Sequence, residues 1–329
     1  MDSILSLAAQ NLISPIILFF VLGFAAAFAR SDLSVPEAVA KGMSLYLLFA
    51  IGFKGGASVA AHGIDQTLIF SILAGVILSF VLPFIAFVLL RVMTGLTAID
   101  AAAVAAHYGS ISIVTFVAAS SVLQTAGLMS EGYMVAVAAA MEAPAILAAL
   151  WLVARADAKA GQGGGMDAGL LREILLNGSI VLLIGSFIIG GVTGQEGLDK
   201  IASFIVSPFQ GVLCLFLLDM GLVAGRGLRD ARHLLKPGLF AFGVLMPLIG
   251  SCLGLGTGLL LGLSTGGVML MMTLSASASY IAVPAAMRVA LPEANPSIYL
   301  TLSLGITFPF NLTLGIPIYL ALARAATGG

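Results

Sequence analysis

Charged side chains are scarce in this chain of 329 residues, which carries 14 Lys and Arg and 15 Asp and Glu, or 9% of its composition. Hydrophobic residues make up 60%. A soluble globular protein has about 25% charged and about 45–50% apolar residues. A chain with so little charge cannot cover a water-facing surface of its own, which excludes a soluble enzyme and a disordered protein. The composition therefore indicates an integral membrane protein.

Basic charge, cysteine and histidine are also scarce, and each absence excludes a class of function. The formal net charge is −1, so the chain offers no basic field for nucleic acid. Cys214 and Cys252 both lie in apolar runs, which argues against a disulfide framework and a cysteine-based metal site. The three histidines form no HExxH or similar metal-binding spacing. We expect no covalent cofactor and no nucleic-acid partner.

Long uncharged runs predict the membrane spans. A hydrocarbon core about 30 Å thick needs roughly 20 apolar residues per helix. Charged and turn-forming residues divide the sequence into ten predicted spans: 11–29, 41–60, 67–93, 98–125, 131–154, 173–193, 201–225, 237–262, 266–290 and 297–323. The predicted fold class is an all-α polytopic membrane protein.

Lysine and arginine in the short loops predict the orientation of these spans, because cytoplasmic loops carry an excess of positive residues. With the N-terminus outside, the inner segments hold eleven of the 14 basic residues and the outer ones hold Lys54, Lys200 and Arg324. Both termini are therefore predicted on the outer side. The basic stretch 226–236 is interpreted as a cytoplasmic loop rather than as a nucleic-acid patch.

The two halves of the sequence are related. A glycine-rich polar stretch at 156–172 predicts a cytoplasmic linker between residues 1–155 and 173–329, which contain five spans each. Small residues recur between the halves in the same order and at offsets of 165 to 169: Gly42, Gly52 and Gly56 with Gly211, Gly221 and Gly225, Ser110 and Ser112 with Ser277 and Ser279, and Pro144 with Pro309. Because five is odd, the second half enters the membrane from the opposite side, so the predicted repeat is inverted.

Serine-rich segments in the middle of the fourth and ninth spans predict that both helices are broken. In lipid, a break is tolerated only where protein or a cavity supplies hydrogen-bond partners. We expect the two helices to cross at their breaks, where N-terminal helix ends favour an anion and C-terminal ends a cation. The alternative is that these serines only bond back to their own helices and allow close packing. The predicted substrate-binding residues are Gly109, Ser110, Ile111, Ser112, Ser277, Ala278, Ser279 and Asn311.

Two carboxylates, Glu142 and Asp219, lie inside predicted spans. At that depth an ionisable group costs at least about 2.5–3.5 kcal/mol, and it is usually paired or lines a pathway. Glu142 lies near the middle of the fifth span, and Thr307 and Asn311 hold the equivalent place in the tenth. Asp219 is either a second ion site or a neutral or capped structural acid. Hard oxygen ligands suit a sodium ion, and the predicted sodium-binding residues are Glu142, Thr115, Thr307, Ser275 and Asp219.

The motifs at 107–116, 277–288 and 305–311 resemble those of the sodium-dependent bicarbonate permeases of bacterial and cyanobacterial inorganic-carbon uptake, and the resemblance covers essentially the whole chain. It implies a five-plus-five inverted repeat like that of the bile-acid sodium symporters, with a core domain that moves against a gate domain. It also implies a homotrimer in the bacterial inner membrane, with bicarbonate and sodium bound between the crossed breaks. Many family members carry a longer cytoplasmic segment between the halves and bind a small PII-like regulatory protein on the cytoplasmic face. Here that segment is only 156–172, so the resemblance leaves this partner open but disfavoured.

These features together predict a sodium-dependent bicarbonate symporter that works by alternating access. Two transport alternatives stay open: a sodium symporter for another small organic anion, and a sodium/proton antiporter, which needs a titrating acid pair near the breaks. An intramembrane enzyme is disfavoured, because the sequence has neither a Gly-x-Ser-x-Gly elbow nor the aspartate pair of an intramembrane aspartyl protease.

Overall fold

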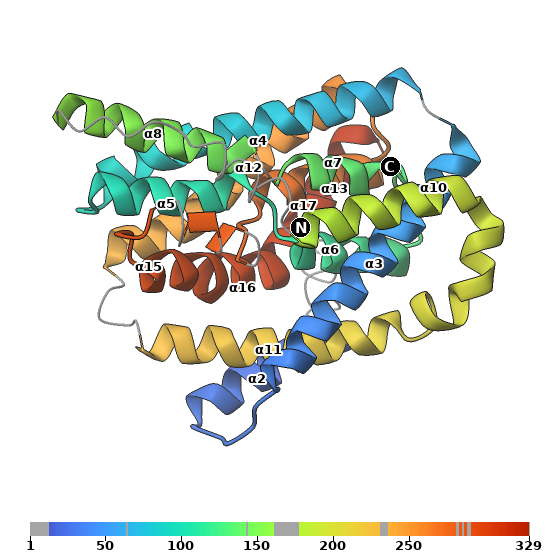
Figure 1. Ribbon diagram of the computed structural model, residues 1–329, viewed down its shortest axis with the longest axis horizontal. Coiled ribbons are helices and arrows are strands. Elements are labelled where there is room, and N and C mark those ends of the chain that lie inside the picture. Colours follow the sequence, from blue (N-terminus) through green and yellow to red (C-terminus); the bar gives the residue numbers. More distant parts are fainter. Residues whose placement is uncertain are drawn as a thin grey trace.

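The computed structural model describes residues 13–63, 65–142, 144–160, 178–230, 236–280, 283–284, 286–287 and 291–328. Every regular element among these residues is a helix (Figure 1). Eight spans are long and apolar enough to cross a membrane: Glu37–Ala61, Gln66–Met93, Ala98–Thr125, Met134–Val153, Val181–Ile205, Phe209–Arg229, Pro237–Leu260 and Pro296–Thr327. Two shorter apolar helices lie at the first and ninth predicted spans. The protein is thus a polytopic all-helical membrane protein.

The helices follow the predicted spans closely in chain order. The first half of the sequence contains α2 (Pro15–Phe28), α3 (Glu37–His62), α4 (Gln66–Met93), α5 (Ala98–Gly109), α6 (Ile113–Thr125), α7 (Met134–Ala140) and α8 (Pro144–Ala160). The second half contains α10 (Gly178–Ile205), α11 (Phe209–Asp230), α12 (Pro237–Leu260), α13 (Thr265–Ala276), α15 (Pro296–Leu300), η1 (Thr301–Thr307), α16 (Phe308–Phe310), η2 (Asn311–Gly315) and α17 (Ile316–Thr327), where η marks a π-helix.

The fourth and ninth predicted spans lie at the centre of the molecule. The most apolar stretch of Ala98–Thr125 is entirely buried, and so is every residue of α13 after its first. Around them, α4 and α8 pack on α5, and α12 and α17 pack on α13. Alanine and glycine are frequent in both central segments, and such small side chains let neighbouring helix backbones come close.

Two further helix pairs are held at backbone contact by glycine. α2 packs along α11, and α3 packs along α10 (Figure 1). A Cβ at Gly56 would overlap the carbonyl oxygen of Phe187, and one at Gly221 would overlap that of Phe20. These glycines therefore allow a close approach that no other residue permits. Each pair combines one helix from either half of the sequence.

The structure corrects the predicted boundary between the sixth and seventh spans, which was wrong. α10 continues to Ile205, and α11 begins at Phe209 rather than at residue 201. Gly194 kinks α10 with φ 59° and ψ −151°, a backbone conformation that is essentially restricted to glycine. Beyond the kink, Glu196 and Lys200 form an exposed ion pair of 2.7 Å. Charges that suggest a loop in the sequence thus lie on the exposed side of a helix.

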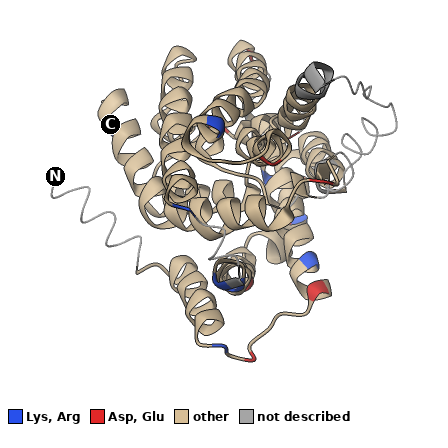
Figure 2. Cartoon of the chain, turned by 90° about the vertical axis from the view of Figure 1, so that its left-hand side faces the viewer, with Lys and Arg blue, Asp and Glu red and all other residues tan. Residues whose placement is uncertain are grey.

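Charged residues occupy few positions along the ribbon (Figure 2).

Part of the predicted linker 156–172 is helical, since α8 extends to Ala160. The rest of that linker lies outside the described residues, as do Arg172, Arg232 and Arg288 of the inner basic set.

We predict that the glycine contacts set the stability of the two helix pairs. Gly56→Ala should lower the free energy of unfolding in detergent by about 1–3 kcal/mol, because overpacking a tight contact forces the backbones apart. Gly42→Ala is the matched control on the same helix, since a Cβ there would meet nothing within 4 Å. Thermal unfolding of the purified variants measures both, and equal unfolding temperatures would contradict the assignment.

Candidate functional site

Both predicted helix breaks are present. α5 ends at Gly109 and α6 begins at Ile113, while α13 ends at Ala276 and residues 277–280 are not helical. The first serine of each motif has almost the same extended backbone, with φ −84° and ψ 161° at Ser110 and φ −85° and ψ 162° at Ser277. Two segments 167 residues apart therefore interrupt their helices in the same way.

The second serine of each motif accepts hydrogen bonds from residues that follow it. Ser112 Oγ accepts hydrogen bonds from the Thr115 amide at 3.2 Å and from Thr115 Oγ1 at 2.9 Å. Ser112 is therefore the N-cap of α6, and its side-chain oxygen satisfies a donor that the helix itself cannot. Ser279 Oγ accepts a 3.5 Å hydrogen bond from the amide of Val283.

The two breaks also bond to each other. The Ser279 amide donates to the His107 carbonyl oxygen at 2.7 Å, and His107 Nδ1 donates to the Ser279 carbonyl oxygen at 2.6 Å. Ser277 Oγ accepts from the Ser112 amide and donates to the Leu274 carbonyl oxygen, both at 2.9 Å. Each break therefore supplies the partners that the other lacks, and the rule that irregular backbone in lipid needs such partners is met.

Several backbone amides at the breaks have no hydrogen-bond acceptor in the described part of the chain. Among the described residues, no hydrogen bond engages the backbone N–H of Ile111, Ile113, Val114 or Ala278. Ile113 and Val114 form the first turn of α6, and Ile111 and Ala278 are 1% and 3% exposed. Free N–H groups at a helix N-terminus carry positive partial charge, so this arrangement can bind a small anion.

Glu142 and Asn311 meet the C-terminal ends of the first helical segments. Ser110 Oγ donates to Glu142 Oε2 at 2.8 Å, and Asn311 Nδ2 donates to the Ala276 carbonyl oxygen at 2.8 Å. Asn311 Oδ1 in turn accepts from the Tyr319 hydroxyl at 2.7 Å. Glu142 lies between α7 and α8, and Asn311 begins a π-helical stretch, an irregularity that is common at functional sites. Oxygen atoms at helix C-termini favour a cation.

The remaining predicted sodium-binding residues lie in different surroundings. Thr307 Oγ1 donates to the Gly243 carbonyl oxygen and accepts from the Tyr108 hydroxyl, both at 2.6 Å. Ser275 Oγ is buried and has no partner among the described residues. Asp219 is 7% exposed on α11, and no hydrogen bond within the described part of the chain links it to either break.

No three His, Cys, Asp or Glu side chains come together as a metal site in the described ranges. A cation at the breaks would therefore depend on one carboxylate together with hydroxyl, amide and carbonyl oxygens. Such a donor set fits a weakly held monovalent ion better than a tightly bound divalent or transition metal.

The sequence did not point to two acids, each of which joins a broken helix of one half to a loop of the other half. Glu131 accepts from the Ser264 amide at 2.7 Å and from Ser264 Oγ at 3.1 Å, at the start of α13. Asp100, in the first turn of α5, accepts from the Asn295 amide at 2.9 Å. The sequence carries a signal for these contacts, because Thr97 and Ser264 are 167 residues apart and both cap the helices that follow.

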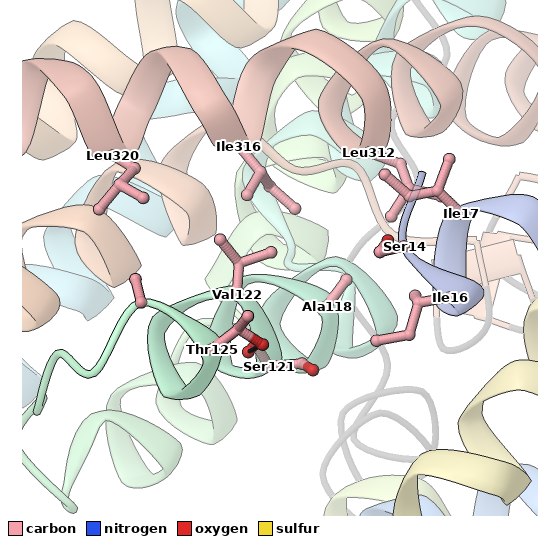
Figure 3. A pocket seen from close by; sticks show the side chains of 11 residues that line it. Ser14, Ile16, Ile17, Ala118, Ser121, Val122, Thr125, Leu312, Ile316 and Leu320 are labelled. Atoms are coloured by element: carbon pink, nitrogen blue, oxygen red, sulfur yellow. Dashed lines mark hydrogen bonds between the residues drawn. The ribbon is translucent and has the colours of Figure 1, made fainter. Parts of the chain in front are cut away.

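Two crevices flank α6. The first, of about 140 Å³, lies between α2, α6 and the last spanning segment, with Ile17, Val122 and Ile316 facing one another (Figure 3). The second, of about 200 Å³, lies between α3, α6 and α7, and the two crevices share Ser121. The break residues line neither crevice, and their side chains are at most 4% exposed. The structure is therefore closed around the breaks.

Comparison with known proteins gives a family. No curated protein matches the chain. The family model described as the Na+-dependent bicarbonate transporter superfamily matches residues 15–324, which include both breaks, Glu142 and Asn311. The chain therefore belongs to the Na+-dependent bicarbonate transporter superfamily.

Proposed function

We propose that this protein takes up bicarbonate together with sodium by alternating access, with both ions bound at the two helix breaks. One observation carries the proposal: the breaks bond reciprocally to each other while amides that could hold an anion stay free. A carboxylate that could hold a cation lies one hydrogen bond away, at 2.8 Å from Ser110 Oγ.

Backbone amides and serine hydroxyls form the proposed anion site. Bicarbonate is a planar monoanion whose oxygens accept hydrogen bonds, and the free N–H groups of Ile111, Val114 and Ala278 are donors in a water-poor setting. Hydrogen bonds to a charged partner contribute about 1.5–3 kcal/mol each. The binding set we propose is the one predicted from the sequence: Gly109, Ser110, Ile111, Ser112, Ser277, Ala278, Ser279 and Asn311.

The proposed sodium site is centred on Glu142, next to the C-terminal end of α5. Its carboxylate is 7% exposed and accepts from Ser110, so a bound cation would offset the charge on this buried group. Thr115, Thr307 and Ser275 are the hydroxyl candidates, and Asp219 remains a candidate for a second ion. The antiporter alternative needs two acids that interact, and Asp219 belongs to the α2–α11 pair rather than to the breaks.

The proposed architecture is an inverted repeat of ten spans in two halves, 1–155 and 173–329, with the linker between them. The pairing of α2 with α11 and of α3 with α10 supports it, since exchange of the halves converts one pair into the other. We define α2, α3, α10 and α11 as the gate domain and the other helices as the core domain. The two crevices lie where gate helices face core helices.

We further propose a homotrimer in the bacterial inner membrane, with both termini on the outer side and lipid around the assembly. A PII-like regulatory protein is not part of this proposal, because the cytoplasmic segment between the halves is short.

Uptake of radiolabelled bicarbonate by cells that lack their own carrier should depend on sodium. Replacing sodium with choline is expected to abolish the uptake attributable to the protein, because bicarbonate cannot accumulate without the coupling ion. Uptake that persists in choline would overturn the symport proposal. Competition by other small carboxylates at equal concentration would favour the organic-anion alternative.

Glu142→Gln should raise the sodium concentration for half-maximal uptake about tenfold or more, because an interaction with a charged group contributes about 1.5–3 kcal/mol. Ser110→Ala should act in the same direction. Expression near the wild-type level is expected for both. Sodium titration of uptake measures the effect, and an unchanged sodium dependence in both variants would remove this site assignment.

Ser277→Ala should affect bicarbonate more than sodium, since it releases the Ser112 amide at the start of α6. We expect the half-saturating bicarbonate concentration to rise about fivefold, equivalent to about 1 kcal/mol. Thr273→Val is the matched control, because in the described part of the chain Thr273 Oγ1 bonds only to Met269 in its own helix. A larger shift in sodium affinity than in bicarbonate affinity would mean that the two sites are exchanged.

A further inference from the structure

Lys54 is a cation inside a membrane-spanning helix, and no carboxylate of the described residues forms a salt bridge with it. Its Nζ lies 4.1 Å from the centroid of the Phe209 ring. Within the described ranges, no hydrogen bond or salt bridge engages this ammonium group. A charge in a spanning segment is costly, and it usually faces a cavity that serves as a pathway.

The crevice beside α6 provides such a cavity. Besides Lys54, its polar lining comprises Ser120, Ser121, Gln124, Ser130 and Glu131. The crevice lies between the gate helix α3 and the core helices α6 and α7, and it extends to Phe116 in the first turn and a half of α6. It therefore leads from loop 126–133 toward the segment whose N-terminal amides lie at the break.

The charge of Lys54 is not neutralised by the acid in this crevice. Glu131 bonds to the amide and hydroxyl of Ser264 at 2.7 and 3.1 Å. It thus lies at the N-terminus of α13, whose positive partial charge offsets that of the carboxylate. The Ser120 hydroxyl donates to the Phe116 carbonyl oxygen at 2.9 Å, and Ser121 Oγ accepts from Gln210 Nε2 at 2.9 Å. Among the described residues, the Lys54 ammonium group, the hydroxyl protons of Ser121 and Ser130 and the Gln124 amide then remain available to an anion.

The position is also asymmetric between the halves. Lys54 lies between Gly52 and Gly56, whereas Val223 holds the equivalent place between Gly221 and Gly225. If the halves are related as proposed, this repeat-related position of the gate helices carries a positive charge in one half only. Lys54 lies toward the predicted outer loops.

We propose that Lys54 and the crevice beside α6 form an outer binding site for a small oxyanion, which captures bicarbonate before it reaches the breaks. The identity of the anion rests on the proposed function, whereas the site itself rests on the unpaired ammonium group and its polar cavity. A single positive charge raises the local anion concentration and the rate of encounter, so the site should act on apparent affinity rather than on maximal rate.

Uptake kinetics give the first test. Lys54→Met should raise the half-saturating bicarbonate concentration about five- to thirtyfold, as expected for one charge acting over a few ångströms in a partly screened site. The sodium dependence and the maximal rate should stay near wild type. Lys54→Arg should keep most of the affinity. Lys200→Met is the matched control, because Lys200 is exposed and already paired with Glu196. Equal shifts in the Lys54→Met and Lys200→Met proteins would overturn the proposal.

Thiol labelling tests the site without transport. Cys214 and Cys252 are first replaced by alanine, and Ser120→Cys then places one thiol in the crevice. An anionic methanethiosulfonate reagent should react faster than a cationic one, bicarbonate should slow the anionic reagent, and Lys54→Met should lower the anionic-to-cationic rate ratio at least about fivefold. An unchanged ratio in the Lys54→Met protein would overturn the anion site.

The two tests separate this inference from the proposed function. A changed labelling ratio in a protein that shows no sodium-dependent uptake would support the anion site and contradict the symport proposal. Normal sodium-dependent uptake with an unaffected Lys54→Met variant would contradict the outer site alone.

Discussion

The structure depends on one constraint: backbone groups released by a broken helix in a membrane must find partners within the protein. Here the partners come from a second broken helix. The Ser279 amide and the His107 carbonyl form one direct bond, and Ser277 Oγ bridges the Ser112 amide and the Leu274 carbonyl on the other side. Because neither break can be satisfied alone, the fourth and ninth spans have to meet, and the surrounding helices take their places around that junction. The match to the transporter superfamily covers both breaks.

The parts of the fold that sequence could predict are those governed by local chemistry. Charge scarcity predicts a membrane protein, and the repeated Ser-x-Ser pattern predicts two breaks that the structure contains at the expected residues. The prediction failed after Gly194, because Glu196 and Lys200 pair along an exposed helix instead of ending one. Charged residues show where the hydrocarbon region ends. A helix can continue beyond that point into water, so the end of an apolar run does not give the end of the helix.

The sequence predicted that the two broken spans meet, but not the individual side-chain bonds between distant segments. Glu131 and Asp100 both precede or start apolar runs, and nothing local shows that each bonds to a segment more than 130 residues away. His107 likewise has several possible roles in isolation, and its two bonds to Ser279 follow only from the meeting of the breaks. By contrast, Glu142 and Asn311 bond to residues that are 32 and 35 positions away in the sequence. Both residues occupy equivalent places in the repeat, so the sequence pattern could identify them.

The glycine contacts of α2 with α11 and of α3 with α10 restrict how the two halves of the chain can move. Each pair takes one helix from the first half of the chain and one from the second. Glu131 and Asp100 likewise join the halves, because they bond the starts of α13 and α5 to loops of the other half. A movement of one half against the other would break the close backbone contacts within both helix pairs. Any rigid body that moves in this protein must therefore be assembled from both halves.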